Sequence, residues 1–388
     1  MTTTQREDPR LNPFPWYKRM RADTPVGNDP RYGGWGVFCY DDVQEVISNH
    51  AVFSSQLYGG GVPSTSDPIA ASMLSSDPPR HRQLRSLVTQ AFTPRAIEAL
   101  APRIAAIVDE LLDAALPAGR FDAINDLGAP LPVIVIAEML GIPTEDRARF
   151  KVWSDAIVTF GSGAGMSGFT AQREMASYFM GIIEQRRRAP DEDLISGLLQ
   201  AEIGGERLSL AELLGFCALL LVAGNETTTN LLGNALLCFA ERPDVWERLR
   251  ANPDLVPQAI EEVIRFRSPV QAMYRVTTQP FELRGRSIPA RASVAAYLGS
   301  ANHDETRFAD PERFDLDRQP NRHLGFGHGI HYCLGAPLAR LEARIALTAL
   351  LERVRTLRRA DERSLEGLDS PIVYGVRHLP LAVELASF

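Results

Sequence analysis

Apolar residues recur at intervals of three and four along most of this chain, which is the spacing of amphipathic helices. The longest such stretch covers 209–241, and shorter ones lie at 144–157, 169–188, 254–266 and 336–354. Strand patterns are short: WGVFCY at 35–40, SVAAYL at 293–298, and YRVTT with FELRG within 274–285. The pattern predicts a mainly α protein with a minor β region.

The longest stretch begins with a helix-capping signal and has a polar centre. Ser209 and Glu212 have the spacing of a capping box, and between Glu212 and Glu241 the only charged residue is Glu226. A segment of this length could cross a bilayer. Its middle, however, reads NETTTN at 225–230, and six consecutive polar residues at a bilayer centre are costly. We therefore expect no membrane span and a helix buried in a soluble protein.

Two loops, at 56–80 and 160–169, are rich in helix-breaking residues. The second places Gly163, Gly165 and Gly168 at the spacing of the dinucleotide-binding fingerprint. That fingerprint requires a preceding strand and a βαβ unit, whereas helical patterns flank these glycines. We interpret the segment as a helix–helix connection.

Composition narrows the class of protein. Of the 388 residues, 45% are hydrophobic, and no linker or low-complexity tract divides them, so we expect a single domain over 1–388. The net charge of -7 argues against a nucleic-acid partner. Because the four cysteines are scattered and the N-terminal MTTTQREDPR has no signal-peptide pattern, we expect a cytoplasmic protein. We also expect a monomer.

One cysteine lies in an unusual setting, FGHGIHYCLGA at 326–336. The three glycines of this segment would let backbone amides point at the Cys333 sulfur, and a helix starting near Ala336 would direct its positive end at the same atom. Both effects favour a thiolate. Three roles are open: a buried structural cysteine, a nucleophile with His328 or His331 as its base, and the axial ligand of a haem iron.

The same segment resembles the haem-binding signature of the cytochrome P450 haem-thiolate monooxygenases, most closely of the soluble bacterial type. The matching positions are Phe326, Gly327, Gly329, His331, Cys333 and Gly335. The resemblance covers almost the whole chain and implies the triangular, mainly α fold of that family, with haem b between the long helix and the cysteine loop. It implies that Cys333 is the metal ligand, as an axial thiolate, and that Phe326, His331 and Gly335 help to bind the cofactor.

The polar centre of the long helix contains AGNETT at 223–228. Ala223 and Gly224 are small, so a flat ligand could approach the backbone, and the Thr227 hydroxyl can bond back to the Ala223 carbonyl. The resemblance implies that Ala223 and Gly224 contact haem. It implies that Thr227 is a catalytic residue that hydrogen-bonds dioxygen, and that Glu226 belongs to a catalytic proton relay.

Four side chains could donate to the two carboxylates of a haem. His81 and Arg85 are four residues apart and share one predicted helix face. The resemblance implies that both bind the propionates, together with Arg275 and His331.

Glu262 and Arg265 are three residues apart on another predicted helix. An exposed pair of this kind contributes little to stability. The resemblance implies a buried structural pair instead, with Arg313 as its third member.

The implied reaction is hydroxylation of an apolar small molecule of fatty acid, terpenoid or steroid type by O₂. The chain has no flavin or nicotinamide fingerprint, so the electrons are expected from a separate ferredoxin or flavodoxin with its reductase. We hypothesise that Arg340 and Arg344 form a basic docking patch, a purely structural role being the alternative. The residues expected to line the substrate pocket are Leu220, Val270, Ala272, Met273 and Val373.

Two other functions stay open. One is a haem-thiolate enzyme that is driven by peroxide or performs a non-oxygenating rearrangement, and the other is a haem sensor or carrier without catalysis. The pair Glu226 and Thr227 argues against both, since neither function needs a proton relay for O₂.

Overall fold

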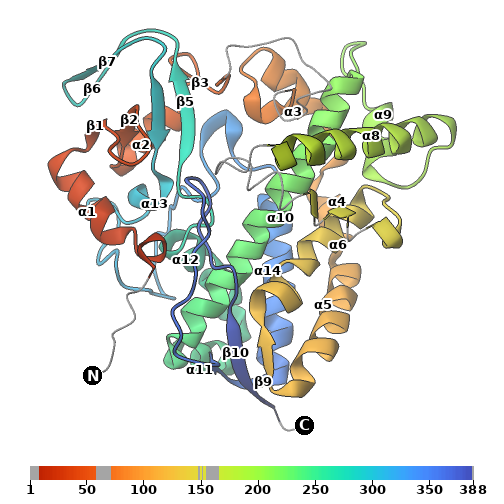
Figure 1. The fold of residues 1–388 in the computed structure, drawn as a ribbon, viewed down its shortest axis with the longest axis vertical. Coiled ribbons are helices and arrows are strands. Elements are labelled where there is room, and N and C mark those ends of the chain that lie inside the picture. Colours follow the sequence, from red (N-terminus) through yellow and green to blue (C-terminus); the bar gives the residue numbers. More distant parts are fainter. Residues whose placement is uncertain (1–7, 58–70, 147–148, 151, 154–165, 387–388) are drawn as a thin grey trace.

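Helices dominate the computed structural model, which describes residues 8–57, 71–146, 149–150, 152–153 and 166–386 (Figure 1). The α-helices are α1 (Phe14–Asp23), α2 (Tyr40–Ser48), α3 (Arg80–Ala91), α4 (Pro94–Glu98), α5 (Ala101–Ala115), α6 (Pro130–Met139), α8 (Met166–Arg188), α9 (Leu194–Gln200), α10 (Leu210–Ala240), α11 (Pro243–Ala251), α12 (Val256–Phe266), α13 (Leu298–Ala301) and α14 (Ala336–Arg353).

The strands described are short and pair mostly in antiparallel fashion. They are β1 (Val26–Asn28), β2 (Trp35–Val37), β3 (Phe53–Ser54), β4 (Arg120–Asp122), β5 (Met273–Thr277), β6 (Phe281–Leu283), β7 (Arg286–Ile288), β8 (Ser293–Ala296), β9 (Val354–Arg359) and β10 (Pro380–Leu385). The largest sheet has the order β1-β2-β8-β5-β3, in which only β2 and β8 run parallel. A second sheet has the order β4-β10-β9, and β6 pairs with β7.

Helix α10 crosses the middle of the molecule, with the five-stranded sheet to its left and α5, α6 and α8 to its right in Figure 1. Its predicted capping box is present: Ser209 Oγ accepts from the Glu212 amide at 3.3 Å, and the Glu212 carboxylate accepts from the Ser209 amide at 2.9 Å. Among the described helices, α10 alone is long and apolar enough to span a membrane, and 56% of its most apolar window is buried inside the fold.

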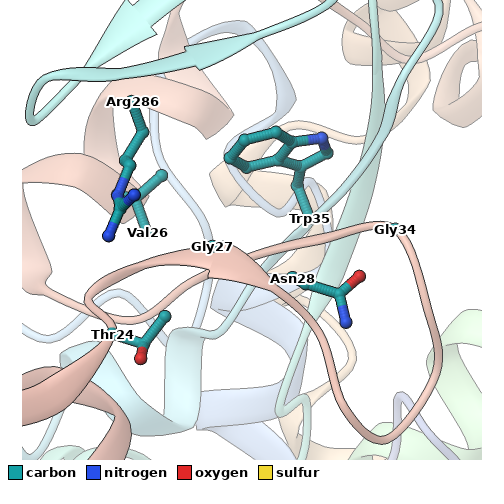
Figure 2. Close-up of a pocket in the computed structure, with 7 residues that line it drawn as sticks. All are labelled: Thr24, Val26, Gly27, Asn28, Gly34, Trp35 and Arg286. Atoms are coloured by element: carbon teal, nitrogen blue, oxygen red, sulfur yellow. The ribbon is translucent and has the colours of Figure 1, made fainter.

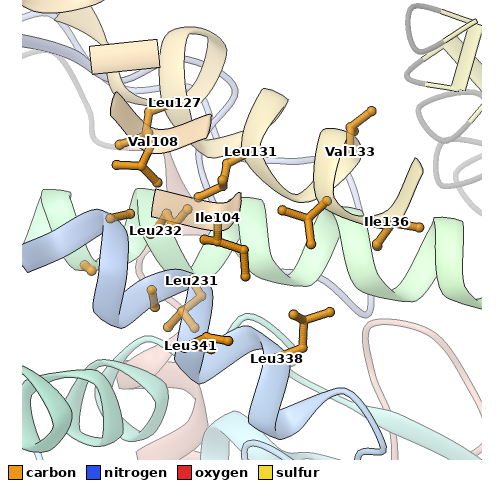
Figure 3. Close-up of a cluster of buried hydrophobic side chains, with 14 of the residues drawn as sticks. Ile104, Val108, Leu127, Leu131, Val133, Ile136, Leu231, Leu232, Leu338 and Leu341 are labelled. Atoms are coloured by element: carbon orange, nitrogen blue, oxygen red, sulfur yellow. The ribbon is translucent and has the colours of Figure 1, made fainter. Parts of the chain in front are cut away.

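The largest hydrophobic cluster joins α5, α6, α10 and α14. Figure 3 shows aliphatic side chains of these helices directed at one another, among them Ile104, Val108, Leu131, Ile136, Leu231, Leu232, Leu338 and Leu341. Burying one such side chain contributes about 1.5–3 kcal/mol. Because α14 directly follows the cysteine loop, this packing fixes the end of the loop relative to α10.

Most of the elements predicted from periodicity are confirmed. Helices α8, α10, α12 and α14 and strands β2, β5, β6 and β8 lie within the predicted segments or within a few residues of them. The segment predicted as a helix at 144–157 begins as a 3₁₀ helix (Thr144–Asp146), and much of the rest lies outside the described residues. Of the fingerprint-like glycines, Gly163 and Gly165 also lie outside them, whereas Gly168 belongs to α8. That the chain is a single domain stays a prediction.

Candidate active site

The cysteine loop directs two backbone amides at the sulfur of Cys333. The amides of Gly335 and Ala336, at the start of α14, donate to this sulfur, while the Cys333 amide donates to the Phe326 carbonyl at 2.9 Å. A Cβ on Gly335 would lie 4.0 Å from the sulfur, an ordinary contact, so Gly335 contributes through its amide rather than through its missing side chain. The prediction of a glycine amide at the sulfur is therefore confirmed for Gly335.

The other two glycines of the loop, Gly327 and Gly329, are required by the backbone conformation of the turn. Gly327 and Gly329 have φ values of +72° and +69°, which favour glycine. The Gly327 amide donates to the Leu324 carbonyl at 2.8 Å, and a Cβ on Gly329 would lie 3.2 Å from Ser48 Cα of α2. The expectation that the Gly327 amide points at the sulfur is wrong, because this amide donates to Leu324 within the turn. For the Gly329 amide it stays a prediction, and the missing side chain of Gly329 allows the close contact with α2.

The protein environment alone does not favour the thiolate that the sequence predicts. Burial raises the pKa of the Cys333 thiol, although the two amides and the charges of Arg85 and Arg340 act to lower it. A partly buried sulfur with amide donors and nearby positive charge suits a metal cation as its partner, since a metal cation deprotonates a coordinating thiol. The donor set therefore fits an iron ligand.

The four donors expected at the propionates lie together. The rings of His81 and His331 are 4.3 Å apart between centroids, and Arg85 Nη1 donates to the carbonyl of Ile330 at 3.1 Å. Arg275, only 4% exposed on β5, donates Nη1 to a neighbouring backbone carbonyl at 2.8 Å. Within the described part of the chain, neither arginine forms an ion pair.

This cluster carries positive charge that lacks a full counter-charge. Burial, with the nearby charge of Arg85, lowers the pKa of His81 to about 4; burial, with the neighbouring His81 and arginines, lowers that of His331 to about 3. Both histidines are therefore neutral at pH 7. Burial also lowers the pKa values of Arg85 and Arg275, and Nε2 of His81 is buried without a hydrogen-bond partner among the described atoms. One buried and one partly buried guanidinium, with an unused imidazole nitrogen, fit a ligand with two carboxylates, as haem has.

Sequence reasoning missed the residues that support this cluster. Ser55 Oγ lies 2.9 Å from His331 Nε2, and the Asp77 carboxylate accepts from Ser54 Oγ at 2.5 Å and from the Ser55 amide at 3.1 Å. Asp77 also precedes α3, where its carbonyl accepts from the His81 amide. These contacts join β3, α3 and the cysteine loop, and no local sequence pattern marks them.

The centre of α10 has one partly open face. Ala223 is exposed, and Leu220, Gly224 and Thr227 are partly exposed at the spacing of one helix face, although most of the helix is buried. As predicted, Thr227 Oγ1 donates to the Ala223 carbonyl, at 2.6 Å. This face borders open space large enough to expose an alanine in the middle of the fold, which fits a flat cofactor against Ala223.

Two further details describe the packing of this helix, while the expected contact of Ala223 and Gly224 with haem stays a prediction. The side of Gly224 that a Cβ would occupy faces Ile136 of α6 at 2.4 Å, so the absence of a side chain there serves helix packing. The helix also stays continuous from Leu210 to Ala240, and the Glu226 carbonyl accepts from Asn230 Nδ2 at 2.7 Å. Glu226 itself is partly exposed.

Glu262 and Arg265 form the expected buried pair, with Nη2 of Arg265 2.7 Å from Oε1 of Glu262. The expected third member is wrong. The side chain of Arg313 is exposed, and its contribution is a backbone carbonyl that accepts from Arg265 at 3.1 Å. Arg318 pairs with Glu262 at 3.2 Å instead, because its chain turns back toward α12.

The expected pocket residues divide into two groups. Leu220, Val270, Met273 and Val373 are partly exposed, and Val270 and Val373 form an isolated β-bridge. Ala272 is fully buried in a hydrophobic cluster, so its assignment to the pocket is wrong. A separate surface cavity of about 380 Å³ lies where β1 and β2 meet β7, as Figure 2 shows, and shares no lining residue with the donor cluster.

Comparison with known proteins identifies the family. The cytochrome P450 family model matches residues 160–368, and the chain belongs to this family. It is 46% identical to cytochrome P450 109 of Bacillus spizizenii, with 97% of this chain and 93% of the relative covered. It is 42% identical to the cytochrome P450 monooxygenase PikC of Streptomyces venezuelae, with 97% and 92% covered.

Solved structures agree with this assignment. CYP109E1 from Bacillus megaterium, in complex with testosterone, superposes with a TM-score of 0.91 at 42% identity, and 97% of this chain and 99% of that chain are covered. The predicted fold, class of enzyme and cofactor are thereby confirmed: the chain is a haem-thiolate monooxygenase that uses haem b.

Proposed function

We propose that this enzyme hydroxylates an apolar small molecule at a haem whose iron is bound by Cys333. One oxygen atom of O₂ enters a C–H bond, and two electrons and two protons convert the other into water. The observation that carries the proposal is that three features occur together: a cysteine sulfur with two amide donors, a cluster of cationic donors without a full counter-charge, and a partly open face at the centre of α10.

The chain would hold the cofactor from two sides. Cys333 would bind the iron, and Arg85, Arg275, His81 and His331 would donate to the carboxylates. The two arginines would supply counter-charge for the two carboxylates, and the two histidines would add hydrogen-bond donors. When bound, the haem supplies the activation of O₂.

Thr227 and Glu226 would transfer protons on the open face of α10. The Thr227 hydroxyl donates to the Ala223 carbonyl, so its oxygen lone pairs are left to accept from a donor in the open space. Glu226, the preceding residue, is partly exposed and can exchange protons with water. The pair would therefore pass protons toward the reacting oxygen while the surrounding apolar residues limit the entry of water.

We propose a steroid or a molecule of similar size as the substrate class, with terpenoids and fatty acids as the alternatives. The relative CYP109E1 binds testosterone, and the partly exposed Leu220, Val270, Met273 and Val373 offer apolar contacts. Electrons would come from a separate ferredoxin or flavodoxin with its reductase, since relatives in the family use separate redox partners. We further propose that the enzyme works in the cytoplasm as a monomer.

A spectral titration tests the substrate proposal. The ferric, haem-loaded protein is titrated with testosterone, a terpenoid and a long-chain fatty acid, and the Soret band is followed for the shift that accompanies loss of water from iron. The steroid should give the tightest saturable shift and a hydroxylated product with a reconstituted ferredoxin system. Tighter binding and faster turnover of the fatty acid would refute the steroid assignment.

A further inference from the structure

Arg340 of α14 is fixed against the cysteine loop. Its Nε and Nη2 donate to the two carboxylate oxygens of Glu261 at 2.7 and 2.8 Å, and its Nη1 lies 3.3 Å from the Tyr332 hydroxyl. The guanidinium carbon lies 4.4 Å from the centroid of the Phe326 ring. Bidentate pairing and stacking over a ring are properties of arginine that lysine does not reproduce. The side chain is thus held in one position although it is 36% exposed.

Two of its partners belong to the loop segment that leads to the cysteine. The Phe326 carbonyl accepts the Cys333 amide hydrogen bond, and Tyr332 directly precedes Cys333. At the start of the loop, His323 Nε2 lies 3.1 Å from Glu261, and its Nδ1 accepts from a backbone amide, so the proton is on Nε2. Glu261 therefore holds His323 at the beginning of the loop directly and, through Arg340, contacts Phe326 and Tyr332, which precede the ligand.

The charges of this network lie close to the sulfur. Burial favours the neutral acid, but the hydrogen bonds from Arg340 and His323 outweigh it and hold the pKa of Glu261 at about 2. The ion pair is therefore fully formed at neutral pH. The contacts of Arg340 with Tyr332, the residue before Cys333, and with Phe326, whose carbonyl accepts from the Cys333 amide, place its positive charge beside the ligand segment.

Arg344, one turn further along the same face of α14, has a different environment. It is 46% exposed, and its ion pair in the described structure is a 3.4 Å contact with the exposed Glu98. The two arginines that the sequence suggested as one docking patch therefore differ: one is bound to the cysteine loop, and the other faces solvent. Arg344 is a matched control for Arg340.

We propose that Arg340 is a positioning residue for the cysteine ligand and that it raises the reduction potential of the haem, with Glu261 limiting this effect. The proposal rests on Cys333 as the iron ligand. A positive charge near the thiolate stabilises the reduced, more electron-rich iron, and a carboxylate paired with it diminishes that stabilisation. Docking of a redox partner is then left to residues such as Arg344.

The test compares the haem-loaded variants Arg340→Gln, Arg340→Lys, Glu261→Gln and Arg344→Gln. Reduction potentials are measured by spectroelectrochemical titration, and haem loss is followed as transfer to excess apomyoglobin. Arg340→Gln should lower the potential, Glu261→Gln should raise it, and Arg344→Gln should leave it unchanged. Arg340→Lys keeps the positive charge but loses the bidentate pairing with Glu261, so its reduction potential should stay near that of the wild type. Its haem loss should become about tenfold faster, the size of effect typical of residues that hold a metal ligand in place.

Two results would overturn the proposal. Equal shifts for Arg340→Gln and Arg344→Gln would indicate a general surface-charge effect. Shifts of the same sign for Arg340→Gln and Glu261→Gln would indicate that both merely loosen the loop. If Arg340→Gln does not retain haem, Arg340→Lys and Glu261→Gln decide the question. A wild-type ferrous carbon-monoxide complex without the red-shifted Soret band would instead refute Cys333 as the ligand. This result distinguishes a wrong ligand assignment from a wrong role for Arg340.

Discussion

Glu342 makes the stability of this protein depend on pH in a way that one substitution should remove. It lies on α14, is 1% exposed, and its Oε2 is buried without a hydrogen-bond partner in the described structure. Leu338 and Ala346, one turn before and after it, are buried apolar residues. Burial raises the pKa of Glu342 from 4.5 to about 8.

The direction in which the free energy of unfolding changes with pH follows from the protons bound by the folded and unfolded states. Between pH 4.5 and 8 the folded protein keeps the Glu342 proton, whereas the unfolded chain has lost it, so the free energy of unfolding falls as the pH rises. Below pH 4.5 the contribution is fully present, and above the folded pKa it is lost. From the two pKa values, we expect a loss of about 3.5 kcal/mol between pH 5 and pH 8.

The assay is denaturant unfolding of haem-loaded wild type and Glu342→Gln at pH 5 and pH 8. Glutamine has the same shape and stays neutral, so the variant should gain about 3.5 kcal/mol on the wild type between these pH values. Subtracting the free energy of unfolding of the wild type from that of the variant at each pH removes the contribution of the other titrating groups. The control is Glu352→Gln, an exposed position on the same helix, which should show no such gain. A pH-independent difference for Glu342→Gln would refute the reasoning.

Three further predictions concern the site and its support. Cys333→Ser should abolish the red-shifted Soret band of the ferrous carbon-monoxide complex and monooxygenase turnover; retention of full turnover would contradict the assigned ligand. Thr227→Ala should leave substrate binding intact but release peroxide in place of product, which an oxygen and peroxide balance measures, and unchanged coupling would count against its role with protons. Glu262→Gln should cost about 3–5 kcal/mol in denaturant unfolding, since it weakens a pair with Arg265 that is fully buried; a cost like that of an exposed pair would contradict this.

Periodicity predicted the helices that position the site because their apolar faces pack on one another. Helix α10 follows this rule, and the local chemistry of Ser209 and Glu212 also marked its start correctly. The cysteine loop was found from its glycines, since two of them need positive φ. Signals of this kind are local, so a single sequence carries them.

Contacts between distant segments were not predictable in the same way. The third member of the buried pair, Arg318 in place of Arg313, depends on how the chain turns back to α12. The contact of Ser55 with His331 joins residues 276 positions apart. Ala272 has the apolar character of a pocket residue, yet it is fully buried in the cluster with Trp16, Phe38 and Tyr297 from distant segments.

Two adjacent glutamates on α12 have different proposed effects, one on the stability of the fold and the other on the reduction potential of the haem. Glu262 is fully buried and, through Arg265 and Arg318, anchors the segment that leads to the cysteine loop. Glu261, one residue earlier, is partly exposed and binds Arg340 at the loop itself. Consecutive helix residues point in directions about 100° apart, so one helix can serve both segments. A change at Glu262 should therefore act on global stability, whereas one at Glu261 should act on the haem potential with a smaller effect on unfolding.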